Sequence, residues 1–256
     1  FAENFLFEYE NGPETVWSIQ RSHQDGTLTG NIDYSVMLNS PMSNEYGCCW
    51  FHIPSQNLVN AFKTGNDGLP LFETYNTSDL NLNLDKVDPR LSHTVALPNQ
   101  PWKYETQLIY TVADWTRRPD IYGNFSSLKE NVSPDCECFE RIAPFMSSSK
   151  NTILIRYADV LLWKAEALIE LGNLNDAMGI INQLRLRASN STDRLYDSEG
   201  NVLADYHVSQ YTAFPDKEFA RKALRWERRL EFAEEGIRFF DLVRWGIAKE
   251  TLDSYF

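Results

Sequence analysis

Apolar residues recur at helical spacing between Thr152 and Ala188. In ILIRYADVLLWKAEALIELG they return at steps of four, four and three residues, which places them on one face of a helix. We therefore predict helix from Thr152 to Gly172, because glycine readily takes the left-handed conformation of a helix C-cap. Asn175 is the predicted N-cap of a second helix. The periodic apolar residues of the two helices are Tyr157, Leu161, Ala165, Leu168, Ala177, Ile180, Ile181, Leu184 and Ala188.

Two amphipathic helices joined by a short turn predict an antiparallel helical hairpin, the unit of tetratricopeptide-like arrays. A single hairpin cannot bury its own apolar faces. We therefore expect helical neighbours, either in an absent portion of the protein or in another chain.

A third helical pattern begins near Asp216, after an irregular stretch at residues 190–215. Its apolar stripe is interrupted at Gly236 and then resumes at the same spacing, so we predict two helices that meet in a bend. Both stripes are predicted to face the core. The first consists of Ala223, Trp226, Leu230 and Ala233, and the second of Phe240, Val243 and Ile247.

The charges of this third pattern form two lines of like sign. Residues of equal charge four positions apart destabilise an isolated helix by a few tenths of a kcal/mol per pair. Each line is therefore predicted to find partners elsewhere in the fold, so we interpret RRLEFAEEGIRFFDLVRW as a scaffold and not as a binding site. The lines are Arg221, Arg225 and Arg229, and Glu227, Glu231 and Glu235.

Residues 30–150 have a different texture, being rich in Asn, Pro, Gly and Ser. These residues favour turns, so long ordered loops are expected there. Short strands are predicted at Thr15–Gln20 and Thr106–Ala113, and a short helix near Ser55. The predicted fold class is thus mainly α, with a loop-rich segment at 1–150 as the candidate ligand-binding part and a helical part at 151–256.

The net charge of −12 over 256 residues argues against a nucleic-acid partner, because phosphate binding requires a basic surface. No run of eighteen apolar residues is present for a membrane helix. The first residues lack the basic start and apolar centre of a signal peptide, so any targeting signal is expected outside this chain.

Four cysteines occur as two close pairs, Cys48 with Cys49 and Cys136 with Cys138. Neither pair has the spacing of a zinc site or a redox motif. We expect buried thiols or one long-range disulfide, and a surface or periplasmic location would suit the disulfide.

Four blocks in order along the chain resemble the SusD/RagB family. Ile155–Ala188 and Glu227–Gly246 resemble the C-terminal signature of the family. Pro54–Leu71 resembles its short helix and following turn, and Val87–Leu91 resembles its Asp-Pro-Arg element. The chain corresponds to the central and C-terminal portion, since family members are usually about twice as long and open with a lipoprotein signal and an acylated cysteine.

The resemblance implies a fold of tetratricopeptide-like hairpins that carries a long irregular segment. It also implies a surface glycan-binding lipoprotein of Bacteroidetes, which captures an oligosaccharide or polysaccharide at the outer membrane and delivers it to a SusC-type TonB-dependent transporter. On this interpretation, contact with the membrane is made only through a lipid anchor outside this chain.

Enzyme motifs are absent from the sequence. No nucleophile elbow, phosphate-binding loop, dinucleotide fingerprint or HExxH motif occurs, and the four histidines are scattered. We predict no catalytic residue, no cofactor and no metal site. Two alternatives stay open: a tetratricopeptide-type protein-interaction scaffold and, resting on acid content alone, a glycoside hydrolase with paired carboxylates.

Sugar binding requires aromatic rings that pack on C–H faces, and polar side chains that bind hydroxyl groups. Aromatic residues in turn-rich loops are therefore the candidates, with Trp102 and Trp115 favoured because polar residues surround them in sequence. Tryptophans in periodic elements are assigned to the core. The glycan-binding candidates are Trp102, Tyr104, Trp115, Tyr122, Asp114, Arg117, Tyr46 and Trp50, and the core tryptophans are Trp17, Trp163, Trp226 and Trp245.

Overall fold

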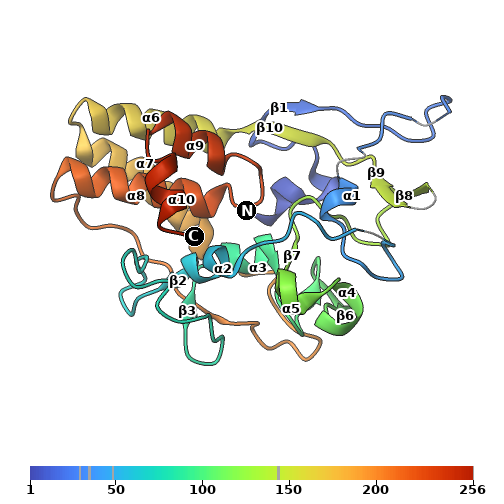
Figure 1. The fold of residues 1–256 in the computed structure, drawn as a ribbon. Helices are drawn as coiled ribbons and strands as arrows, with labels where there is room; N and C mark the ends of the chain where they lie inside the picture. Colours follow the sequence, from blue (N-terminus) through green and yellow to red (C-terminus); the bar gives the residue numbers. More distant parts are fainter. Residues whose placement is uncertain (29, 34–35, 48, 143–144, 256) are drawn as a thin grey trace.

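The computed structural model describes residues 1–28, 30–33, 36–47, 49–142 and 145–255. Three long helices lie together at one end of the molecule, and a loop-rich region with short helices and strands makes up the rest (Figure 1). The predicted mainly α fold with a long irregular segment and a few short strands is confirmed.

Helices α6 (Tyr157–Glu170) and α7 (Leu174–Ser189) form the predicted hairpin. Gly172 lies in the turn with φ +85°, in agreement with its predicted role at the end of the first helix. The predicted N-cap was displaced by two residues, because Asn173 precedes α7 while Asn175 lies inside it.

Helix α8 (Lys217–Glu231) begins where predicted, and the side chain of its N-cap Asp216 accepts a hydrogen bond from the backbone N–H of Phe219 at 2.7 Å. It packs against α6 and α7, so the hairpin finds a helical neighbour within this chain, contrary to our expectation. Alanines are frequent in the shared core, and their small side chains allow close approach. The core includes Ala158, Leu162, Ala165, Ile169, Ala177, Ile181, Leu184, Ala220, Ala223 and Leu224.

The predicted bend at Gly236 is confirmed. Gly236 has φ +75° and separates α8 from α9 (Arg238–Arg244), which is followed by α10 (Ala248–Asp253). The second predicted core stripe is wrong, because Phe240 and Val243 are exposed. The inner face of α9 is formed instead by Asp241 and Leu242, which are buried.

The loop-rich region contains short helices connected by turns. The helix predicted near Ser55 is present, and the Ser55 hydroxyl accepts a hydrogen bond from the backbone N–H of Leu58 at 3.2 Å. Two 3₁₀ helices, Ala2–Phe5 and Phe7–Tyr9, precede it. The α-helices are α1 (Val36–Asn39), α2 (Gln56–Ala61), α3 (Arg90–Thr94), α4 (Val112–Trp115) and α5 (Pro119–Tyr122).

The strands form small separate sheets. Neighbouring strands in each sheet are antiparallel, except that β11 runs parallel to β3. The pairs are β1 (Thr15–Ile19) with β10 (Thr152–Arg156), β4 (Val95–Ala96) with β7 (Ser126–Ser127), β5 (Pro101–Trp102) with β6 (Glu105–Ile109), and β8 (Phe139–Ile142) with β9 (Phe145–Ser148). A three-stranded sheet has the order β11 (Asp205–Tyr206), β3 (Lys86–Val87), β2 (Lys63–Thr64).

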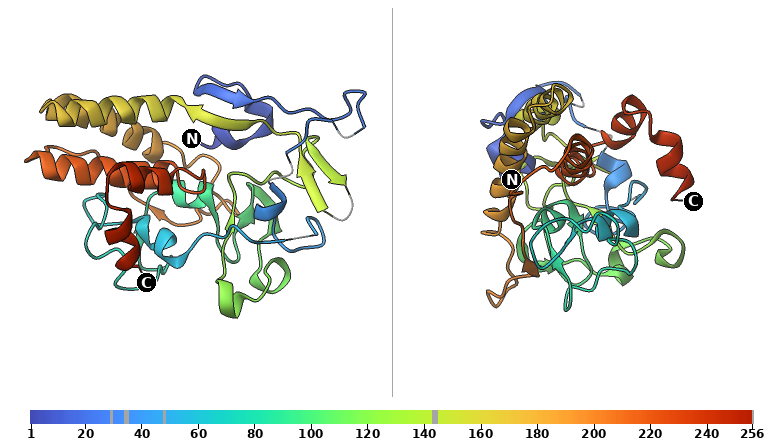
Figure 2. Two further views of the ribbon diagram at one scale, coloured as in Figure 1. Left: turned by 45° about the horizontal axis from the view of Figure 1, so that its top comes forward. Right: turned by 90° about the vertical axis from the view of Figure 1, so that its left-hand side faces the viewer.

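The strand predicted at Thr15–Gln20 is confirmed as β1. The strand predicted at Thr106–Ala113 is only partly present, because β6 ends at Ile109 and helix α4 begins at Val112. Thr152–Arg156 was predicted as helix but forms β10, since it pairs with β1. Figure 2 shows β8 and β9 at the end of the molecule opposite the long helices.

A disulfide joins Cys136 and Cys138, two positions apart. Cys49 is also disulfide-bonded, and Cys48 lies outside the described residues. The expectation of buried thiols or one long-range disulfide was therefore wrong for the pair at 136 and 138, because these thiols are joined locally.

A buried ion network connects the loop-rich region to α8. The Arg90 guanidinium lies 2.7 Å from an Asp88 carboxylate oxygen, 2.5 Å from Glu227 and 3.1 Å from Glu231. Arg156 lies 2.9 Å from Glu231 on the other side. Further members are Glu14, Lys129, Arg185, Arg187 and Glu235.

This network confirms that the line of Glu227, Glu231 and Glu235 finds partners elsewhere in the fold. Burial alone would raise the pKa of Glu231, but the charges of Arg187, Arg156 and Arg90 outweigh it and hold this pKa well below its usual value. The division at residue 150 stays a prediction, although the network and the β1–β10 pair both cross it.

Candidate functional site

The four aromatic residues Trp102, Trp115, Tyr46 and Trp50 were predicted to contact sugar, but the structure buries them. Trp102 is 0% exposed and Trp115 is 5% exposed. A buried ring cannot pack on a pyranose, so these four assignments are corrected.

The physical reason is that the aromatic rings form a core for the loop-rich region. Trp102 and Trp115 have ring centroids 5.0 Å apart, and Tyr46 and Tyr110 pack against both. Long periodic elements are absent from this part of the described chain, so large aromatic side chains supply most of the apolar area that loops can bury.

The polar atoms of this aromatic core are satisfied inside it. The Trp102 indole N–H donates to the Tyr46 hydroxyl at 2.6 Å, and that hydroxyl donates to the Val132 carbonyl at 2.5 Å. The Trp50 indole N–H donates to Ser126 Oγ at 2.7 Å. Polar residues that neighbour these tryptophans in sequence are therefore not the groups that bind them in space.

Tyr104 lies in the turn between β5 and β6, where Lys103 and Tyr104 both have positive φ. The side chain is half-buried, and its hydroxyl lies 2.8 Å from Nδ1 of His93. Burial raises the pKa of Tyr104. Its hydroxyl is thus committed inside the protein, and its contact with a glycan stays a prediction.

The remaining candidates lie at the surface and meet a residue that sequence reasoning missed. The Arg117 guanidinium carbon is 4.5 Å from the ring centroid of Phe51 and 5.6 Å from that of Tyr122. Phe51 is 51% exposed and Tyr122 is 49% exposed. We call Phe51, Arg117 and Tyr122 the aromatic platform.

The buried core holds this aromatic platform in place. The Tyr122 ring meets the Trp50 ring edge to face, with centroids 6.5 Å apart. Trp115 anchors the end of α4 in the aromatic core, which fixes the position of Arg117 two residues later. Gly123, with φ +99°, ends α5 directly after Tyr122.

Asp114 adds a polar group beside the platform in sequence, on α4. Its carboxylate is exposed and accepts a hydrogen bond from the Thr111 hydroxyl at 2.7 Å. Arginine and carboxylate groups next to exposed rings are the combination that sugar hydroxyls and C–H faces require.

Phe51 was missed because no periodicity marks the loop around it. Trp50 has φ +59°, so the alternation of an extended strand does not apply here, and the sequence carries no signal that sets the exposed Phe51 apart from its buried neighbour.

Two tryptophans assigned to the core are instead at the surface. Trp17 on β1 is 60% exposed and Trp163 on α6 is 44% exposed. The β1–β10 ribbon has two strands and leaves one face open, and Trp163 lies on the outer side of the hairpin. Trp226 and Trp245 are half-buried.

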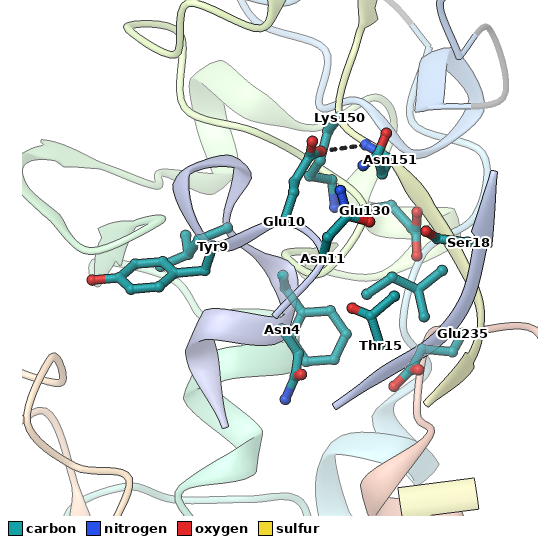
Figure 3. A pocket seen from close by; sticks show the side chains of 13 residues that line it. Asn4, Tyr9, Glu10, Asn11, Thr15, Ser18, Glu130, Lys150, Asn151 and Glu235 are labelled. Carbon is teal, nitrogen blue, oxygen red and sulfur yellow. Dashed lines mark hydrogen bonds between the residues drawn. The ribbon is translucent and has the colours of Figure 1, made fainter. Parts of the chain in front are cut away.

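A small polar cavity lies between the N-terminal segment and strands β1 and β10 (Figure 3). Glu10, Glu130 and Lys150 line it, and the Glu10 carboxylate accepts a hydrogen bond from the backbone N–H of Asn151. Burial raises the pKa of Glu10 and of Glu130. The cavity measures about 30 Å³, which is room for about one water molecule and not for a sugar ring.

Within the described ranges, no three His, Cys, Asp or Glu side chains gather as they would around a metal ion. Likewise, none of the described helices combines the length and apolar character needed to cross a membrane.

Comparison with known proteins matches residues 13–256 to the SusD family. A SusD-like protein of Formosa agariphila is 33% identical over 255 residues, which cover 97% of this chain and 43% of that protein. A second SusD-like protein of the same organism is 34% identical over 112 residues, covering 44% of this chain and 18% of that protein. The chain thus spans less than half the length of the curated relatives it matches.

Solved structures share the fold. A SusD-like protein from Bacteroides fragilis superposes with a TM-score of 0.67 at 22% identity, over 98% of this chain and 46% of that one. A SusD-like carbohydrate binding protein from the same species gives a TM-score of 0.64 at 22% identity, over 98% and 45%.

Proposed function

The chain belongs to the SusD family, and from this membership we propose that it binds an oligosaccharide or polysaccharide at the aromatic platform without catalysing a reaction on it. The proposal places the protein at the surface of the outer membrane, held by a lipid anchor. A SusC-type TonB-dependent transporter then takes up the captured glycan.

The observation that carries the proposal is the exposure of two rings around one guanidinium. Phe51 and Tyr122 each leave about half of the side chain open to solvent, while Arg117 lies against both. Exposed rings leave apolar surface in contact with water, and a ligand that covers them removes that surface from water. The C–H face of a pyranose is such a ligand, and the guanidinium can donate to its hydroxyls.

Rigidity supports the same interpretation. The Trp50 ring lies behind Tyr122, and the indole N–H of Trp50 is bonded to Ser126, so the platform is already in place before binding. Pre-organisation reduces the entropy lost on association. Affinity should still be modest, because an open polar surface buries little apolar area.

A titration with a panel of oligosaccharides tests the proposal, read out by calorimetry on the 256-residue chain. Tyr122→Ala should weaken binding of the best oligosaccharide roughly five- to tenfold, because one ring contact contributes about 1 kcal/mol. Its thermal unfolding midpoint should stay unchanged, since the ring is half exposed.

Trp163→Ala is the matched control, because Trp163 is equally exposed but lies on α6, at the other end of the molecule (Figure 1). This variant should bind glycan like the wild type. The proposal would be contradicted if no oligosaccharide of the panel bound. It would also be contradicted if Trp163→Ala lost glycan binding while Tyr122→Ala kept it.

Catalysis is tested separately with the same ligand. The bound oligosaccharide is incubated with the protein, and new reducing ends are measured over hours. We expect none, and their appearance at a rate above that of the buffer would replace the binding proposal with hydrolysis.

A second candidate, a protein-interaction scaffold, is favoured by the outer side of α6. Tyr157, Val160 and Trp163 recur at steps of three residues and are all exposed. Under this alternative, Trp163→Ala loses binding of a protein partner, and Tyr122→Ala does not. The two variants therefore separate the two candidate functions.

A further inference from the structure

A second pocket lies away from the aromatic platform, between α2, α10 and the connection from α8 to α9. It measures about 420 Å³, within the range of small-ligand sites. Its walls are partly apolar, with Leu58, Leu242 and Leu252. Polar groups line the rest, including Asn57, Asn76, Tyr75 and Thr251.

Two arginines face this pocket without a carboxylate partner among the described residues. Arg229 donates to the side-chain oxygen of Asn57 at 2.5 Å and to its carbonyl at 3.3 Å, and its guanidinium carbon is 5.0 Å from the Tyr75 ring centroid. Arg238 has its Nη1 atom buried, and within the described part of the chain no group accepts a hydrogen bond from it. A buried guanidinium donor without an acceptor is costly, and on Arg238 no ion pair with a carboxylate among the described residues offsets that cost.

Other arginines of the molecule differ in having a carboxylate partner, although Arg187 and Arg228 also each keep one buried nitrogen without an acceptor among the described residues. Arg90, Arg156 and Arg185 each lie within 3.4 Å of a buried glutamate oxygen. Arg228 pairs with Asp241 at 2.7 Å. These arginines of the core have carboxylate partners, whereas the two pocket arginines have none among the described residues.

Charge in the pocket supports an anionic ligand. Burial and, to a smaller extent, the like charge of Arg229 lower the pKa of Arg238 to about 10. Glu234 also lines the pocket, and burial, together with the negative charge of Glu130, raises its pKa to about 7 against the lowering effect of Lys129. Below pH 7 this carboxyl is mostly protonated, and the pocket then carries two unopposed guanidinium charges.

We propose that this pocket binds the anionic group of an acidic sugar unit, either a carboxylate or a sulfate ester, through Arg238 and Arg229. The inference rests on the proposed function because it specifies a further glycan contact. The planar guanidinium fork suits both anions, since each presents two oxygens at matching spacing. The leucine walls then pack on the ring.

Calorimetry at pH 6 on the 256-residue chain tests the inference with four probes: glucuronate, glucose 6-sulfate, glucose and inorganic sulfate. At least one acidic sugar should bind about tenfold or more tightly than glucose, since a charge-assisted pair is worth that factor. Which of the two binds identifies the anion. Equal affinities for glucose and both acidic sugars overturn the proposal, and so does inorganic sulfate binding as tightly as the acidic sugars.

Arg238→Met removes the charge and keeps the length of the side chain. It should abolish the preference for acidic sugars without lowering the unfolding midpoint, because the group it removes has no acceptor to lose. A structural role for Arg238 predicts the opposite, a lowered midpoint with the preference retained, and that result overturns the proposal.

Arg225→Met is the matched control. Arg225 also lies over the Trp245 ring, at 5.3 Å compared with 6.0 Å for Arg238, but it does not line the pocket. Its acidic-sugar binding should equal that of the wild type. Failure of this inference is distinguishable from failure of the proposed function, because Tyr122→Ala reads the platform with neutral oligosaccharides and Arg238→Met reads the pocket.

Discussion

Glu231 and Glu234 are three residues apart at the end of α8, and the protein treats their charges in opposite ways. Three arginines surround Glu231 and lower its pKa far below the usual value. Burial raises the pKa of Glu234 to about 7, because no arginine pairs with its carboxylate in the described structure. In the first environment, the buried ion network, the carboxylate is paired with arginines. In the pocket beside α9, Glu234 has no arginine partner among the described residues.

The comparison shows how a structural charge differs from one that is available for binding. Both regions carry arginines and glutamates from one segment, RRLEFAEEGIRFFDLVRW, which we interpreted as scaffold. Its Arg228, Glu231 and Glu235 fit that interpretation. Arg229, Glu234 and Arg238 lie on the side that faces the pocket, so the segment supplies both a scaffold and a candidate site.

The largest loss of unfolding free energy is expected from removing the charge of Glu231, at the centre of the buried ion network. Glu231→Gln leaves Arg90, Arg156 and Arg187 without their shared carboxylate, and an uncompensated buried charge costs about 3–5 kcal/mol of unfolding free energy. Urea unfolding should show a loss at the upper end of that range.

The control for this variant is Glu218→Gln, on the exposed side of the same helix. It should leave the midpoint unchanged. A loss of less than about 1 kcal/mol in Glu231→Gln would show that the network contributes little, and the contrast with the pocket would fail.

A somewhat smaller loss of unfolding free energy is expected from truncating a side chain of the aromatic core. Trp102→Ala removes a fully buried indole and should cost about 3–4 kcal/mol, since the surrounding rings cannot fill the cavity. Trp17→Ala, at an exposed ring, should change the unfolding free energy by less than about 1 kcal/mol. If Trp102→Ala instead kept its stability and lost glycan binding, our original assignment of Trp102 to the ligand would be restored.

The pH dependence of stability separates the two glutamates directly. The pKa of Glu234 is about 7 in the folded protein and near 4.5 when exposed, so its contribution to stability is present below pH 4.5 and lost as the pH rises through 7. Glu234→Gln should therefore be more stable than the wild type at pH 8 by about 1–3 kcal/mol, and nearly equal to it at pH 5.

Urea unfolding of both proteins at pH 5, 6, 7 and 8 measures this difference. His93, whose pKa is lowered to about 4 by burial, titrates in both proteins and cancels from the comparison. If the unfolding free energies of wild type and variant changed with pH in parallel, the Glu234 carboxylate would not be an unpaired buried charge at high pH.

The smallest effect is expected at the surface. Arg118 and Asp120 lie 3.0 Å apart, nearly the separation of Arg90 and Glu231, but both are exposed. Solvent screens this pair, so Asp120→Asn should leave the unfolding midpoint within experimental error. A shift as large as that of Glu231→Gln would show that distance and not burial decides the value of an ion pair here.

Much of the helical part could be predicted from its period. The hairpin, the start of α8 after Asp216 and the bend at Gly236 all follow from repeating apolar positions and turn residues. The exposure of side chains on the short helix α9 could not be predicted from the spacing of apolar residues. A stripe such as Phe240 and Val243 shows which residues share a face, but not whether another element covers that face.

The aromatic assignments show the same limit in the loop-rich region. Trp102 has polar neighbours in sequence and apolar ones in space, whereas Trp17 has a strand pattern and an open face. Only tertiary contacts decide such cases. Tyr122, Arg117 and Asp114 lie at the surface, whereas Trp115 of the same stretch is buried; the contact of the three surface residues with a glycan remains a proposal.

The pairing of β1 with β10 has a consequence for biosynthesis. Trp17 pairs with Ile155, so β1 leaves the ribosome long before its partner strand exists. At 5–20 residues per second, the delay is on the order of ten seconds. During that time a strand with Val16, Trp17 and Ile19 has no ladder to join, which makes it a natural target for a chaperone that binds short apolar segments.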